Sequence, residues 1–133
     1  MPRRPASVEL LAALAKILRP RRLRWCVFGA QAAVAYGSPR MTMDVDVTVA
    51  VAPAKVRPLI DALLAAGFLA RTEDLDAFFA RARVIPLVHR STRMPLDLVV
   101  ARDPIELHFL DRAKVRWAGA RHTPSNHPPI RVF

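Results

Sequence analysis

Apolar residues recur at helical spacing in several segments, and we expect each of them to form an amphipathic helix. The first begins at Ser7, a residue type that caps helix N-termini, and ends before Pro20. Further helices are predicted at about 54–66, closed by Gly67, and in a short segment from Asp74, as its cap, through Phe79. Two more are predicted at about 30–36 and 103–115.

Apolar runs with strand character separate these helices. They span 23–28, 44–51, 84–88 and 95–100. The tail 121–133 contains three prolines and two histidines and has no apolar period, so we expect a surface or disordered segment there. The sequence therefore predicts one domain over 1–120 followed by this tail.

Two carboxylates lie in the second predicted strand, at Asp44 and Asp46. Successive side chains of a strand alternate between faces, so these two acids share one face, with Cα atoms about 6.6 Å apart. Two negative charges so close together require a nearby cation. Mg²⁺ is one candidate, because it takes carboxylate and phosphate oxygens as ligands, and arginine is the other.

A third acid, Asp97, lies between Leu96 and Leu98 in an apolar run. A carboxylate in such a run is costly unless it is paired, solvated or bound to metal. If its strand lies beside the Asp44/Asp46 strand, the three carboxylates form a cluster suited to two-metal phosphoryl or nucleotidyl transfer. The alternative is an ion pair with an arginine such as Arg93 or Arg40.

Charge and composition narrow the class of partner. The 133 residues carry a formal net charge of +10, which favours a polyanionic partner such as nucleic acid or nucleotide phosphates. Four arginines lie between positions 19 and 24. They form either a rim that binds anions or a turn exposed to solvent. The single cysteine, Cys26, is expected to be a buried small hydrophobe, and no apolar run is long enough to span a membrane. We expect a cytoplasmic protein.

A glycine at the end of the first strand, Gly29, is a plausible seat for a phosphate. Glycine lets a phosphate approach the backbone, and the free N–H groups of the following helix attract anions. A glycine at such a turn also serves packing alone, so this position by itself is weak evidence.

Three motifs in this order resemble the nucleotidyltransferase superfamily of DNA polymerase β type. They are Val27-Phe28-Gly29-Ala30, then Arg40-x-Thr42-x-Asp44-x-Asp46, and finally Leu96-Asp97-Leu98. Within that superfamily the chain is most similar to the minimal bacterial nucleotidyltransferases that include the AbiEii-type toxins of toxin–antitoxin systems. The resemblance covers about 23–116.

The resemblance implies an α/β (α+β) fold in which a small mixed sheet is flanked by helices. It implies that Asp44, Asp46 and Asp97 bind two Mg²⁺ (or Mn²⁺) ions and carry the catalysis. It also implies a nucleotide site that contains Gly29, Ala30, Arg40 and Thr42. The implied reaction moves a nucleoside monophosphate from a nucleoside triphosphate to an acceptor hydroxyl, with tRNA or another RNA among the acceptors and an antitoxin protein as a partner.

The chain departs from the family pattern in two ways. Ala30 stands where many members have Gly or Ser, which removes a hydroxyl contact to phosphate. Relatives also continue after the fourth helix into a strand and helices with a conserved lysine, whereas here a Pro- and His-rich tail follows. The alternative to an active enzyme is therefore a truncated, inactive module of the same fold that binds nucleotide or nucleic acid.

Overall fold

The computed structural model describes residues 5–28, 45–102, 107, 108, 110, 114–117 and 129–132. Within these ranges one mixed sheet has the strand order β3-β4-β5-β2-β1-β7-β6. The strands are β1 (Trp25–Phe28), β2 (Val45–Val49), β3 (Phe68–Ala70), β4 (Val84–His89), β5 (Met94–Val100), β6 (Lys114–Trp117) and β7 (Pro129–Val132). Helices pack on this sheet, so the predicted fold class is confirmed.

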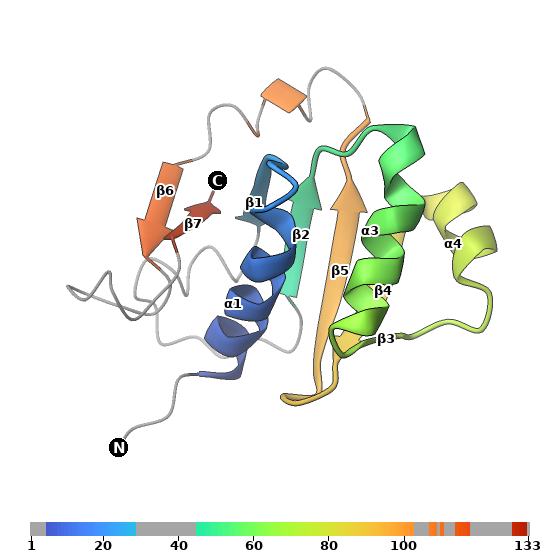
Figure 1. The fold of residues 1–133 in the computed structure, drawn as a ribbon, viewed down its shortest axis with the longest axis horizontal. Helices are drawn as coiled ribbons and strands as arrows, with labels where there is room; N and C mark the ends of the chain where they lie inside the picture. The colour runs from blue at the N-terminus through green and yellow to red at the C-terminus, as the bar shows by residue number, and fades with distance from the viewer. Residues whose placement is uncertain are drawn as a thin grey trace.

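Three helices are described: α1 (Ala6–Leu18), α3 (Pro53–Ala65) and α4 (Leu75–Ala82). Figure 1 shows α1 and α3 side by side over the same face of the sheet, while α4 lies beyond them near β4. The chain connects the parallel strands β2 and β5 through α3, β3, α4 and β4. The antiparallel pairs β1–β2, β3–β4 and β4–β5 complete this half of the sheet.

The main hydrophobic core lies between the sheet and the helices α1 and α3. Every second residue of the central strands is buried there, as strand alternation requires. The strands contribute Val27, Val45, Val47, Val49, Ile85, Leu87, Leu96, Leu98 and Val100. The helices contribute apolar residues at helical spacing, among them Leu14, Leu18, Leu59 and Leu63.

A second, smaller cluster surrounds the cysteine. Cys26 is fully buried with Ala101 and Leu110, and Ala50 and Leu107 pack against this group. The prediction that Cys26 is a buried small hydrophobe is confirmed.

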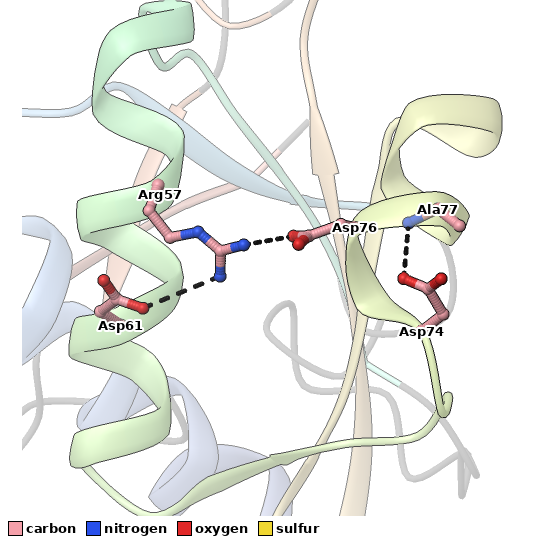
Figure 2. A network of polar contacts seen from close by, with 5 residues as sticks. All are labelled: Arg57, Asp61, Asp74, Asp76 and Ala77. Carbon is pink, nitrogen blue, oxygen red and sulfur yellow. Dashed lines mark hydrogen bonds and ion pairs between the residues drawn. The ribbon is translucent and has the colours of Figure 1, made fainter.

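The helix termini follow the sequence signals unevenly. Asp74 accepts a hydrogen bond from the backbone N–H of Ala77 and caps α4, as predicted (Figure 2). Gly67 follows α3 with a φ of 101°, a left-handed conformation that suits glycine. The predicted cap at Ser7 is wrong: α1 begins at Ala6 after Pro5, and no side chain caps it. Ser7 is instead buried.

The C-terminal part of the chain differs most from the prediction. Leu107, His108 and Leu110 are helical, but residues 114–117 form β6, so a helix that continues to Val115 is wrong. Residues 129–132, predicted to belong to an irregular tail, form β7 between β1 and β6. Both strands have only four residues, too few for alternation to be recognised in the sequence.

Figure 2 shows how α3 and α4 are joined. Arg57 of α3 donates to the carboxylate of Asp76 on α4 and lies within 3.9 Å of Asp61 on its own helix. All three side chains are more than half exposed to solvent, so each pair contributes no more than about 1 kcal/mol to stability.

The buried His89 gives the fold a predictable pH dependence. Burial lowers the pKa of His89 below its usual 6.5, although the Glu9 carboxylate partly opposes this. The unfolded chain therefore binds this proton more readily than the folded chain does. As the pH falls below about 6.5, the free energy of unfolding decreases, by at most about 1.4 kcal/mol per pH unit. Denaturant unfolding between pH 5 and 8 measures this slope. His89→Gln should flatten this slope. Equal slopes in His89→Gln and the wild type would contradict the assignment.

Candidate active site

Two of the three predicted acids face each other across neighbouring strands. β2 and β5 are parallel, and their register aligns Asp46 with Asp97. Aligned residues of adjacent strands point to the same face, on backbones about 4.8 Å apart. The sequence left open whether these strands are neighbours, and the structure shows that they are.

The burial of the two strands explains how carboxylates fit into apolar runs. In β2 the exposed Asp46 lies between Val45 and Val47, which are fully buried. In β5 the partly exposed Asp97 lies between the buried Leu96 and Leu98. The valines and leucines belong to the core under α1 and α3, so both acids lie on the opposite face of the sheet. We call Asp46 and Asp97 the acid pair.

Arg71 places a positive charge beside the acid pair. Its Nη2 atom forms an ion pair with Oδ1 of Asp97, and about a third of each side chain is exposed. Its Nε donates to the carbonyl of Leu87 at 2.8 Å, and its backbone N–H donates to the carbonyl of Pro86 at 2.9 Å. Arg71 is therefore anchored on β4 and reaches across that strand to β5.

The ion-pair partner of Asp97 is Arg71, which differs from the arginines that the sequence suggested. Arg93 was a candidate, but it lies in the turn between β4 and β5 and the ion pair is made by Arg71 instead. Arg40, the other candidate, lies outside the described residues. No sequence signal indicated Arg71, because it directly follows the three-residue strand β3, which the apolar pattern did not predict.

Several predicted site residues fall outside the described ranges. Asp44 is one of them, and so are the nucleotide-site residues Gly29, Ala30 and Thr42. Phe28, the last described residue before Gly29, is aligned with Asp46 in the β1–β2 register. The described part of β1 thus ends level with the acid pair.

The acid pair has the chemistry of a hard-metal site. Carboxylate oxygens are the protein ligands that Mg²⁺ and Mn²⁺ prefer. Within the described residues, no group of three or more His, Cys, Asp or Glu side chains is placed to hold a metal ion. The described part of the chain therefore supplies two oxygen-donor side chains to the predicted cluster.

Comparison with known proteins gives no family assignment. No protein-family model matches this chain, and no curated protein sequence does. Within the described ranges, no helix combines the length and the apolar character needed to cross a lipid bilayer.

Proposed function

We propose that this chain is a metal-dependent nucleotidyltransferase, which moves a nucleoside monophosphate from a nucleoside triphosphate to an acceptor hydroxyl. The observation that carries the proposal is the alignment of Asp46 with Asp97 on parallel neighbouring strands. An Asp-x-Asp sequence is common, but an acid aligned with Asp46 by a strand about fifty residues later is a more specific arrangement. Such carboxylate clusters suit the transfer of phosphoryl and nucleotidyl groups.

Asp46 and Asp97, together with Asp44, would hold Mg²⁺ or Mn²⁺. When bound, the metal supplies charge stabilisation for the reacting phosphate and lowers the pKa of the attacking hydroxyl. Arg71 orients Asp97 through Oδ1 alone, and because a carboxylate offers about four lone-pair sites, this contact leaves Asp97 able to accept further bonds. Asp97 is thus held in a fixed position beside Asp46.

The substrates follow from the resemblance and the charge. Gly29, Ala30, Arg40 and Thr42 are the proposed contacts of the nucleoside triphosphate. The net charge of +10 favours an RNA acceptor, with tRNA as the first to test. A toxin role with an antitoxin partner, in the cytoplasm, completes the proposal.

The alternative is an inactive module of the same fold that binds nucleotide or nucleic acid. One observation favours it: Arg71 already offsets the charge of Asp97. In that case the ion pair has a structural role and no metal is needed at the acid pair.

Metal binding tests whether the acid pair is a metal site. Mg²⁺ with a non-hydrolysable nucleoside triphosphate should raise the melting temperature of the wild type by at least about 2 °C, because a ligand that binds the folded state stabilises it. The increase should disappear in Asp46→Asn. It should grow in Arg71→Met, since a cation that competes for Asp97 is removed.

Arg57→Met is the matched control for Arg71→Met. It removes the same charge from an exposed arginine that is paired with Asp76, away from the acid pair. An equal response in Arg57→Met and Arg71→Met would mean that net charge alone affects the metal. No rise in the wild type, or an equal rise in Asp46→Asn, would contradict the metal site proposed at the acid pair.

A further inference from the structure

A pocket of about 680 Å³ lies beyond the ends of β2 and β5, and four of its ten lining residues are arginines. Four arginines line it, Arg22, Arg24, Arg83 and Arg102, together with residues 50–53, Ala101 and Leu107. We call it the arginine pocket. None of its described lining residues is acidic.

The position of the arginine pocket in the fold is typical of ligand sites. Residues 50–53 follow β2 and lead into α3, and Ala101 and Arg102 follow β5. In open α/β sheets, ligands bind in crevices beyond the carboxyl ends of parallel strands. Ala50 and Ala101 each lie four residues beyond Asp46 and Asp97, about 13 Å along the strands. The pocket is therefore separate from the acid pair.

Backbone hydrogen bonds hold the lining in place. Ala50 N–H donates to the carbonyl of Arg24 at 2.9 Å, Ala101 N–H donates to that of Val49 at 2.8 Å, and Val100 N–H donates to that of Arg83 at 2.9 Å. Four segments of the chain are thus tied together around the pocket before any ligand binds. A pocket formed in this way requires little ordering on binding.

Arg83 carries the argument for a ligand. It ends α4 in a left-handed conformation with a φ of 58°, where glycine is the usual residue. Its guanidinium carbon lies 4.7 Å from the centre of the Phe79 ring, and its Nε is buried without a hydrogen-bond partner. The side chain as a whole is only partly buried and lines the pocket, so its guanidinium charge is placed where a ligand anion can meet it.

Arg22 shares two of these features with Arg83. It lines the same pocket and is also left-handed, with a φ of 55°. Arg24 and Arg102 line the pocket as well and also make contacts within the protein, so Arg83 and Arg22 are the two arginines whose substitution tests the pocket.

We propose that the arginine pocket binds the phosphate groups of a phosphorylated ligand of nucleotide size. Guanidinium groups match the geometry of phosphate oxygens, and a volume of about 680 Å³ lies within the range of small-molecule sites. The small apolar residues 50–53 provide contacts for the organic part of the ligand. The phosphate comes either from a free nucleotide or from the 5′-phosphorylated end of an RNA.

Calorimetric titration in EDTA tests this pocket independently of any metal at the acid pair. The probes are ADP, pyrophosphate and a 5′-phosphorylated RNA 12-mer, each added to the full chain. We expect the wild type to bind at least one probe, and Arg83→Gly to weaken that binding at least about 10-fold. Glycine is favoured at a left-handed φ, so Arg83→Gly and Arg22→Gly should remain folded, and thermal melts check this.

Arg93→Gly is the matched control. Arg93 is also left-handed, with a φ of 60°, but it is exposed in the turn between β4 and β5 and does not line the pocket. Binding within about 2-fold of the wild type in Arg93→Gly supports the pocket. An equal loss in Arg93→Gly and Arg83→Gly, or no binding of any probe at millimolar concentration, overturns it. Binding of ADP or of the RNA alone identifies the source of the phosphate, and Asp61→Asn, a change of an exposed acid on α3, should leave either unchanged.

Discussion

Replacing Asp46 or Asp97 by Asn should lower the rate of nucleotide transfer by at least about 100-fold, the loss typical when one preorganised electrostatic contact to a reacting phosphate or oxyanion is removed. The substitution keeps the shape of the side chain and removes the charge that would hold a divalent cation. The two acids act as a unit, so the double variant should be little slower than either single variant. Initial rates with radiolabelled nucleoside triphosphate and RNA measure the effect.

Asp61→Asn is the matched control for both variants. Asp61 is an exposed acid on α3, and its contact is the long pair with Arg57. We expect its rate to stay within about 2-fold of the wild type. Asp46→Asn and Asp97→Asn proteins that are folded, by their melts, and as active as Asp61→Asn would contradict the assignment of the acid pair to catalysis.

Leu63→Ala should lower the free energy of unfolding by about 2–5 kcal/mol, the largest effect on stability that we expect from a single change in α3. Leu63 is fully buried in the core between α3 and the sheet, so its truncation leaves a cavity as well as lost apolar contact. Denaturant unfolding followed by circular dichroism measures this loss.

The neighbouring Leu64 provides the comparison. It lies in the same helix but is 40% exposed, so Leu64→Ala should change the free energy of unfolding by less than about 1 kcal/mol. Both variants replace leucine by alanine in the same helix, so the change in helix propensity is the same and does not account for a difference between them. Similar losses at both positions would contradict the observed packing of α3 on the sheet.

The sequence predicted the elements whose patterns are long and regular. In β2, alternation predicted that the valines lie on one face and Asp46 on the other, as observed. Asp74 and Gly67 marked helix termini, because capping and left-handed turns depend on one or two residues and their close neighbours. Local physics determines these features, so local sequence was sufficient to predict them.

Features that depend on distant contacts could not be predicted from the local pattern of residues. The alignment of Asp46 with Asp97 is set by strand order, which the spacing of residues does not specify. The partner Arg71 is 26 residues from Asp97 in the chain and follows a strand of three residues. The strands β6 and β7 pair with each other although little in their own sequences indicates strands. The order of the strands and the partners of these side chains are therefore set by tertiary contacts, which the local pattern of residues does not specify.

Transfer of a nucleotide by this chain can be measured with labelled substrates. The folded protein is incubated with Mg²⁺, total tRNA and each of the four α-³²P nucleoside triphosphates in turn, and label on RNA and on the protein itself is counted. The proposal predicts that label from at least one nucleotide moves to an acceptor with the wild type, and that this transfer is lost with Asp46→Asn. No label from any of the four, in a preparation that binds Mg²⁺ and nucleotide, would contradict the proposed enzyme and leave an inactive module that binds nucleotide.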